Sequence, residues 1–286
     1  MSDPAVTDGD PADLALTDWL AAVSDQRPLV EAVTNDVTVD QVAQVIRNWG
    51  GLPVMSDDAR EVGEMVAGAS ACLLNMGTVS EAGEETMLAA GRAANDHGVP
   101  VVVDPVGVGA TATRDRVAER LVSELDVAIL KGNHGEITAL AGEAAEVRGV
   151  ESVGEYGDVA ESAVACARET GAVVVASGER DVVATGETAY ELTAGHPKMG
   201  SVVGTGCTLG GTLATFVGVG DDPVDAALAG TLAFGFAGEA AADEQFGPVR
   251  GPASYKIAFG DAMAGLAETT LPAPHRRIER LATGVA

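Results

Sequence analysis

Short apolar runs alternate with amphipathic stretches along most of this chain, and that alternation restricts the folds open to it. The apolar runs lie at residues 29–33, 52–55, 71–76, 99–103, 127–130 and 172–176. Apolar residues at helical spacing occupy the stretches between them, as Val39, Val42 and Ile46 do. Strands that are apolar throughout, each followed by a helix, predict an α/β fold with a mostly parallel central sheet and helices on both faces.

The pattern changes after residue 177. Two β-rich runs, 181–185 and 188–192, are separated by Gly186-Glu187, which predicts a hairpin added to the sheet. Helical patterns follow at 205–217, 223–246 and about 253–266. No linker divides the chain, so we expect one domain over residues 1–286, with loosely packed ends at 1–11 and 272–286.

Charge and cysteine content exclude several classes of protein. Acidic residues number 43 against 17 Lys and Arg, a net charge of −26, so a nucleic-acid partner is not expected. The three cysteines, Cys72, Cys166 and Cys207, are too widely spaced to indicate a disulfide framework or a zinc site. No apolar run reaches the roughly 18 residues of a membrane span and no leader segment is evident, which predicts a soluble cytoplasmic protein. Few lysines and a dispersed acidic surface resemble the proteins of salt-accumulating organisms.

A glycine-rich segment opens the first of the late helices. It runs Gly200-Ser201-Val202-Val203-Gly204-Thr205-Gly206-Cys207-Thr208-Leu209-Gly210-Gly211. Glycines let the backbone approach a ligand closely, and successive N–H groups at a helix start hold an anion or developing negative charge. A turn that only packs the helix tightly fits the same spacing, so the segment alone leaves both interpretations open. It lacks the Gly-Lys-Ser/Thr of a Walker A loop and the strand and glycine spacing of a dinucleotide fingerprint.

Polar side chains follow several predicted strands, at the edge where the ligand site of an open α/β sheet lies. Asp104 comes directly after an apolar run, and a carboxylate there can hold Mg²⁺ directly or through water. Lys131, one of three lysines in the chain, and Ser177 also stand at strand ends, with a stray surface lysine and a turn-forming serine as the plain alternatives. Asn133 and Glu136 form an Asn-x-x-Glu pattern that fits a metal site or a helix capping box. With Asp104 and the glycine-rich segment, the metal role is favoured.

Several motifs in register resemble one family. Gly204-Thr205-Gly206-Cys207 resembles the Gly-x-Gly-Asp anion-hole loop of ribokinase-like kinases, and its Cys in place of Asp is similar to the hydroxyethylthiazole kinase family. The other matching stretches, in chain order, are Val33-Thr34-Asn35, Gly51-Leu52-Pro53-Val54-Met55, Asn75-Met76-Gly77-Thr78, Asp104-Pro105-Val106-Gly107-Val108-Gly109-Ala110-Thr111, Lys131-Gly132-Asn133-His134-Gly135-Glu136 and Ser177-Gly178-Glu179-Arg180-Asp181. The resemblance therefore covers about residues 34–211.

The resemblance implies a ribokinase-like fold and a phosphoryl transfer. The reaction would move the γ-phosphoryl group of ATP, with Mg²⁺, to the primary alcohol of 4-methyl-5-(2-hydroxyethyl)thiazole, a precursor of thiamine. In that family the residues that place Mg²⁺ and phosphate correspond to Asp104, Asn133 and Glu136. The positions that contact ATP, where the family carries Arg and Thr, correspond to Lys131 and Ser177.

The resemblance also assigns the acceptor side of the reaction. Residues that contact the thiazole correspond to Asn35, Met55 and Gly204. The catalytic loop corresponds to Gly204, Thr205, Gly206 and Cys207, whose N–H groups would stabilise the moving phosphoryl group. The thiol of Cys207 would accept the proton of the alcohol, since a thiolate is favoured at the start of a helix.

The family resemblance also bears on assembly and on the rival functions. As the family is known, the active enzyme is a homotrimer whose thiazole pockets lie between subunits, and residues 34–55 would line such a pocket. A hydroxymethylpyrimidine kinase of the same fold is the near alternative and would be expected to carry Asp at the position of Cys207. The loop at residues 104–111 disfavours an ATP- or ADP-dependent dehydratase that repairs hydrated nicotinamide cofactors. A catalytically silent binding protein is disfavoured by the joint presence of Asp104, Lys131, Asn133 and Glu136.

Overall fold

The computed structural model describes residues 14–142 and 156–281, and their strands form one nine-stranded sheet ordered β2-β1-β3-β4-β5-β6-β7-β8-β9. The parallel strands are β1 (Leu29–Val33), β2 (Leu52–Val54), β3 (Ala71–Asn75), β4 (Val101–Asp104), β5 (Ile129–Asn133) and β6 (Val173–Ser177). The antiparallel strands at one edge are β7 (Asp181–Ala184), β8 (Ala189–Leu192) and β9 (Ile278–Leu281). The predicted mostly parallel sheet and the hairpin after residue 177 are confirmed.

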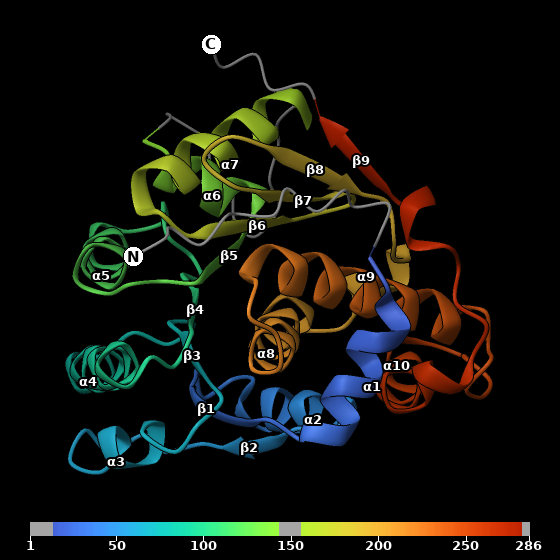
Figure 1. The fold of residues 1–286 in the computed structure, drawn as a ribbon, viewed down its shortest axis with the longest axis horizontal. Helices are drawn as coiled ribbons and strands as arrows, with labels where there is room; N and C mark the ends of the chain where they lie inside the picture. Colours follow the sequence, from blue (N-terminus) through green and yellow to red (C-terminus); the bar gives the residue numbers. More distant parts are fainter. Residues whose placement is uncertain (1–13, 143–155, 282–286) are drawn as a thin grey trace, which may run out of the picture.

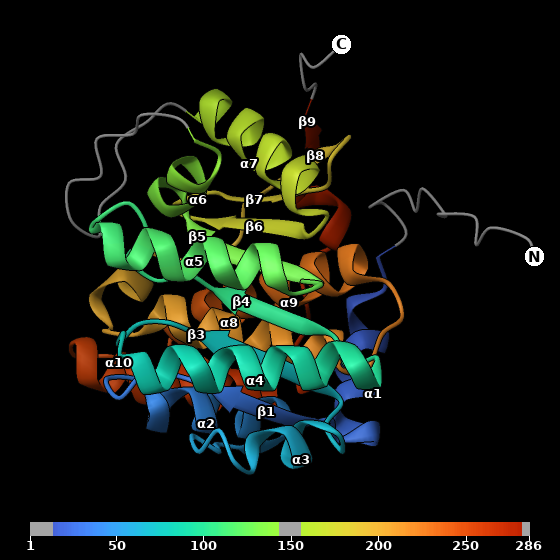
Figure 2. The ribbon, with the colours of Figure 1, turned by 90° about the vertical axis from the view of Figure 1, so that its left-hand side faces the viewer.

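Two layers of helices cover the sheet (Figure 1). One layer holds α1 (Leu16–Gln26), α2 (Val39–Trp49), α8 (Thr205–Val217), α9 (Pro223–Ala242) and α10 (Pro252–Gly265). The other holds α3 (Val62–Val66), α4 (Glu81–His97), α5 (Ala112–Glu124), α6 (His134–Leu140) and α7 (Tyr156–Thr170). Figure 2 looks onto this second layer, with α4 and α5 in front of the strands.

The strand residues supply a hydrophobic core to each layer. Because successive side chains of a strand point to opposite faces, Leu73 and Val102 join the core under α8, and Leu74 and Val103 join the core under α4. All four side chains have no exposed surface. This burial on both faces explains why the parallel strands are apolar throughout and not alternating.

One expectation about the chain ends is wrong. Residues 272–286 were expected to pack loosely, but Ile278–Leu281 form β9, in which Ile278 pairs with Leu192 and Leu281 with Ala189. The backbone makes the pairing, so two apolar side chains suffice to hold the strand and give little sequence signal. Residues 1–11 and 282–286 lie outside the described part of the chain.

Small side chains let α9 lie close to its neighbours. The helix is buried along most of its length, and many of its buried residues are Ala or Gly. A Cβ on Gly235 would lie 2.6 Å from the Cβ of Ala194, and one on Gly238 would lie 2.4 Å from the Sδ of Met199. The backbone of α9 therefore packs directly on residues 194–199, which lead into the glycine-rich segment.

The parallel strands end in polar residues at one edge of the sheet. Asn75 and Asp104 pair in register at the ends of β3 and β4, and Asn133 and Ser177 do so at the ends of β5 and β6. The sequence-predicted ligand edge is thus assembled as expected. Within residues 14–142 and 156–281, no helix combines the length and apolar character that crossing a membrane requires.

Candidate active site

The glycine-rich segment forms a turn that leads into α8. Gly204 has a φ of 89°, in the left-handed region that suits glycine, and a Cβ there would lie 2.7 Å from the Oε1 of Gln41. The hydroxyl oxygen of Thr205 lies 2.8 Å from the carbonyl oxygens of both Met199 and Val202, and its one hydrogen can be donated to either, which fixes the turn. The N of Thr205 donates to the carbonyl of Val202 at 3.4 Å. The next N–H groups of α8, those of Gly206 and Cys207, lack an acceptor one turn earlier within the helix. They can therefore face a ligand.

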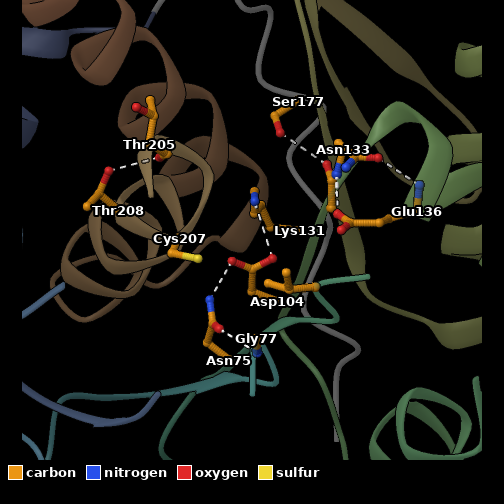
Figure 3. Close-up of polar contacts among 12 residues, drawn as sticks. Asn75, Gly77, Asp104, Lys131, Asn133, Glu136, Ser177, Thr205, Cys207 and Thr208 are labelled. Carbon is orange, nitrogen blue, oxygen red and sulfur yellow. Dashed lines mark hydrogen bonds and ion pairs between the residues drawn. The ribbon is translucent and has the colours of Figure 1, made fainter. Parts of the chain in front are cut away.

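A buried ion pair lies beside this turn (Figure 3). Nζ of Lys131 is 3.2 Å from Oδ1 of Asp104, and the two side chains are 4% and 0% exposed. A Cβ on Gly206 would lie 3.2 Å from the same Nζ, a tight contact, so the ammonium group lies close against the start of α8. Lys131 is therefore no stray surface lysine. It brings a positive charge to the loop that the sequence predicts to bind phosphate.

Burial and pairing both act on the charges of this pair. Burial raises the pKa of Asp104 to about 6, although Lys131 and the hydrogen bond from Asn75 oppose the rise. Burial also acts to lower the pKa of Lys131, but the negative charges of Asp104 and Glu136 outweigh it and raise that pKa overall. At neutral pH the site therefore holds a carboxylate and an ammonium group.

Asn133 and Glu136 form the capping box that the sequence left as an alternative. Oδ1 of Asn133 accepts from the backbone N of Glu136 at 2.9 Å, and Oε2 of Glu136 accepts from the backbone N of Asn133 at 2.7 Å. Oε1 of Glu136 accepts from the N of Gly107 at 2.7 Å, which ties the loop after β4 to the start of α6. These bonds hold the Glu136 carboxylate in place and leave each oxygen a further lone pair.

The carboxylates near the ion pair could bind Mg²⁺, but they do not form a complete set of ligands. In the part of the chain that the structure describes, no three His, Cys, Asp or Glu side chains converge as a ready metal site. Mg²⁺ in phosphoryl-transfer sites is usually held by one or two carboxylates, with water and substrate phosphates completing its shell. The fixed carboxylates of Asp104 and Glu136, which interact electrostatically, fit that requirement.

The acceptor side contains Asn35 and Cys207. Nδ2 of Asn35 lies 3.6 Å from Sγ of Cys207, 2.8 Å from Oγ1 of Thr38 and 2.8 Å from Oδ1 of Asn75. Met55 follows the edge strand β2, and so lies one strand farther out than Asn35, which follows β1. The structure therefore brings Asn35 to Cys207, and it places Met55 on the outer side of this group.

Ser177 lies on the far side of the ion pair from Cys207 (Figure 3). Its hydroxyl donates to the carbonyl of Gly132 at 3.2 Å, which joins the ends of β5 and β6. A Cβ on the next residue, Gly178, would lie 2.4 Å from Cε1 of His134. Burial lowers the pKa of His134, so its imidazole packs as a neutral ring under this turn.

Two residues near the site carried no assigned role in the sequence. Asn75 donates to Asp104 from the end of β3, and its place after an apolar run was the same signal that marked Asp104. Arg114 donates to the carbonyls of Met76, Gly77 and Val106, and so ties the loop after β3 to the loop after β4. No sequence signal distinguished this arginine from those on the surface.

Two hollows lie outside the buried ion pair, one of them beside the glycine-rich turn. One of about 280 Å³ lies between α2, α10 and the glycine-rich turn, lined in part by Gln41, Thr205 and Ile257. Another of about 660 Å³ lies at the opposite ends of the strands, lined in part by Asn95 and Asp126. Asp104, Lys131 and Cys207 are absent from the described residues that line either hollow. We place the candidate site where the charges of Asp104, Lys131 and Glu136 converge.

Comparison with known proteins identifies the family. Residues 20–269 match the hydroxyethylthiazole kinase family. A hydroxyethylthiazole kinase of the haloarchaeon Natronomonas pharaonis is 63% identical over 272 residues, which cover 93% of this chain and 97% of that protein. This relative agrees with the salt-adapted composition.

Solved structures agree with the sequence comparison. A hydroxyethylthiazole kinase protein from Pyrococcus horikoshii is 31% identical, with a TM-score of 0.82 over 93% of this chain and 99% of that one. A ribokinase-like superfamily protein from Enterococcus faecalis is 12% identical, with a TM-score of 0.61 over 86% of this chain and 93% of that one, and it supports the fold alone. The ribokinase-like α/β fold is thus confirmed, and the chain belongs to the hydroxyethylthiazole kinase family.

Proposed function

We propose that the protein transfers the γ-phosphoryl group of ATP to the primary alcohol of 4-methyl-5-(2-hydroxyethyl)thiazole, with Mg²⁺ as the metal. The observation that carries the proposal is the buried Lys131–Asp104 pair, which lies directly beside the amide-rich start of α8 in a member of this family. The reaction would take place in the cytoplasm, where ATP is available and Cys207 stays reduced.

The residues present meet the needs of phosphoryl transfer. Such a transfer depends mainly on alignment of the reactants and on neutralisation of the phosphate charge. Lys131 supplies a fixed positive charge, and the turn of Gly204 and Thr205 leads to the N–H groups of Gly206 and Cys207, which would donate to the transferring group. When bound, Mg²⁺ would neutralise further phosphate charge, held by Asp104 and by Glu136 with Asn133. Ser177 lies on the side where the nucleotide would bind.

In this proposal, Cys207 receives the proton of the alcohol. It stands in the first turn of α8, where the helix dipole favours a negative charge, and the amide of Asn35 can donate to its sulfur. In a loose transition state the alcohol loses its proton late, so a thiol of modest basicity suffices. Asn35 and Gly204 lie beside the thiol and would orient the alcohol, with Met55 against the thiazole ring.

A product assay tests this function. The protein would be incubated at high KCl with ATP, Mg²⁺ and a panel of precursor alcohols that includes hydroxymethylpyrimidine, and products would be identified by mass. We expect the thiazole alcohol to gain one phosphate and the reaction to stop when a chelator removes Mg²⁺. Phosphorylation of the pyrimidine alone would contradict the assignment of the substrate.

We also propose that the protein assembles as a homotrimer with the thiazole pocket shared between subunits. Two valines at the rim of the site are exposed, Val37 by 64% and Val203 by 74%. The residues that follow them in the chain, Thr38 and Gly204, pack on each other, so the two valines belong to neighbouring segments. Exposed apolar side chains beside an active site, on a chain of net charge −26, favour a surface that a second subunit covers.

Light scattering at high KCl tests the assembly. We expect a trimer for the wild type, and weaker assembly and weaker thiazole binding for Val203→Asp and Met55→Asp, with ATP binding retained. Met65 is a matched control, since it is also an exposed apolar residue, 40% exposed, but lies on α3 in the other layer. Met65→Asp should remain trimeric, and a fully active wild-type monomer would exclude the shared pocket.

A further inference from the structure

A chain of hydrogen bonds connects the acceptor side of the site to its charged side. Asn75, the last residue of β3, is 2% exposed and lies between the two. Its Oδ1 accepts from Nδ2 of Asn35 at 2.8 Å, and its Nδ2 donates to Oδ2 of Asp104 at 2.7 Å. Figure 3 shows Asn75 pointing toward Asp104, whose other oxygen faces Lys131. The side-chain amide of Asn75 therefore contacts Asn35 on the acceptor side and Asp104 on the charged side.

The neighbours of Asn75 fix which end of its amide is which. The backbone N of Gly77 lies 3.0 Å from Oδ1, and because an N–H only donates, that atom must be the oxygen. The other end is then the amide nitrogen, which donates to Asp104. Asn35 is fixed in the same way, since its Oδ1 accepts from the backbone N of Val37 at 3.0 Å and of Thr38 at 3.1 Å.

The enclosure leaves little room for another arrangement. A Cβ on Gly77 would lie 2.6 Å from Cγ of Asn35, so the turn after β3 closes tightly over that side chain. Arg114 holds the same turn by donating to the carbonyls of Met76 and Gly77 at 2.9 Å. A buried polar network whose members each make several hydrogen bonds is rigid and sets the geometry of those members.

We propose that Asn75 is a positioning residue, which holds the Asp104 carboxylate and the Asn35 amide in fixed relation so that the alcohol and the phosphoryl group meet in line. The inference rests on the function proposed above and extends it to a residue with no role in that scheme. Asn75 acts through Asn35 and Asp104 and has no contact with substrate of its own. Its removal should therefore lower kcat more than it weakens binding.

Two variants of nearly the same size test the proposal. Asn75→Leu removes both hydrogen bonds, and Asn75→Asp keeps an acceptor for Asn35 but sets a second carboxyl group against Asp104. We expect each to lower kcat by roughly 10- to 100-fold, as small misplacements of reacting groups do, and to change the KM for ATP by less than about threefold. If Asn75→Leu fails to fold, Asn75→Asp still supplies the comparison.

Asn95 provides the matched control. Its side chain also bridges two elements, bonding the backbone N and O of Asp126 at 2.8 Å, but at the opposite ends of the strands. Asn95→Leu should lower the melting temperature while kcat stays within about twofold of the wild type. If Asn75 had a purely structural role, Asn75→Leu would lower the melting temperature as Asn95→Leu does and would leave kcat unchanged.

A double variant gives a second test. Because Asn35 and Asn75 share the hydrogen bond between Nδ2 and Oδ1, adding Asn35→Ala to Asn75→Leu should lower kcat by less than the product of the two single losses. If the kcat losses of the two single variants multiply in the double variant, the proposed role of Asn75 is wrong. The same holds if kcat is unchanged in Asn75→Leu and Asn75→Asp while the wild type is active, and neither outcome contradicts the proposed function. A wild type that phosphorylates a different alcohol is tested with that alcohol, and one that phosphorylates none would overturn both proposals.

Discussion

The two ends of the parallel strands use polar side chains in different ways. At the carboxyl ends, Asn75, Asp104 and Lys131 bond one another and are buried. At the amino ends, Asn95 bonds the backbone of Asp126 beside a hollow of about 660 Å³. The interactions of the first group depend on the ionisation of Asp104 and Lys131. The side chain of Asn95, in the second, only satisfies hydrogen-bonding groups of the backbone.

The contrast distinguishes the candidate site from the hollow at the other end of the strands. The volume at the amino ends is large, but its polar groups satisfy the chain itself. The charges at the carboxyl ends have lost their water, and each therefore acts strongly on its neighbours and on whatever binds beside them. Three predictions test this difference between the two ends.

The largest expected effect compares one aspartate from each end. Asp104→Asn removes the carboxylate and leaves Lys131 buried without its partner, so kcat/KM should fall by at least about 100-fold. Loss of one partner of a buried ion pair also costs on the order of 3–5 kcal/mol, so folding must be checked by thermal unfolding at high KCl. Asp126→Asn should stay within about twofold of the wild type. Equal activity in the two variants would remove the distinction between the ends.

A smaller effect is expected from the cysteines. Cys207→Ser should lower kcat by roughly tenfold and leave the KM for the thiazole alcohol nearly unchanged, since a proton acceptor matters most in the transition state. Cys166 is the control, because it is buried in α7 and burial raises its pKa to about 12. Cys166→Ser should reduce stability and spare kcat. If Cys207→Ser keeps the full kcat, the amides of the turn suffice without the thiol.

The smallest effect concerns a buried carboxyl group with no cation beside it. Oε1 of Glu31 accepts from the N of Ser56 at 2.9 Å, and its Oε2 has no hydrogen-bond partner among the described residues. Burial raises the pKa of Glu31 to about 7, with a further rise from Glu61. Between pH 4.5 and 7 the unfolded chain has released a proton that the folded protein keeps, so this group makes stability fall as pH rises through that window.

Melting curves of Glu31→Gln measure this effect. The neutral amide keeps an acceptor for Ser56 and removes the dependence on pH. The variant should therefore melt at the wild-type temperature near pH 5 and higher at pH 8, with each kcal/mol worth roughly 2–4 °C. If the melting temperatures of the variant and the wild type differ by the same amount at pH 5 and at pH 8, titration of Glu31 is not the cause of the difference.

Much of the fold could be predicted from the sequence, because parallel strands buried on both faces leave an unmistakable pattern. The six apolar runs correspond to β1 through β6, and the helix predicted at residues 205–217 was confirmed as α8. β9 was missed because it pairs through its backbone at the sheet edge. Only two of its four residues are apolar, which is no more than a loop contains.

The site was partly predictable for a different reason. Asp104 and Lys131 each follow an apolar run, so their meeting at one edge follows from the parallel sheet. The sequence could not reveal that the Glu136 carboxylate is held from both sides, because its bond to Gly107 spans 29 residues. It likewise left the capping and metal roles of Asn133 open. The capping box is now seen, while the metal role stays a prediction.

The small side chains of α9 have a consequence for the entropy of the molecule. Burying Leu or Met freezes rotamers at a cost of about 0.5–2 kcal/mol each, whereas Ala and Gly have no such freedom to lose. The contacts of Gly235 with Ala194 and Gly238 with Met199 thus bring backbone against side chain with few alternative packings. At its Ala and Gly positions, the helix that supports the turn of Gly204 has no rotamers to exchange, so ordering that part of the support costs little side-chain entropy.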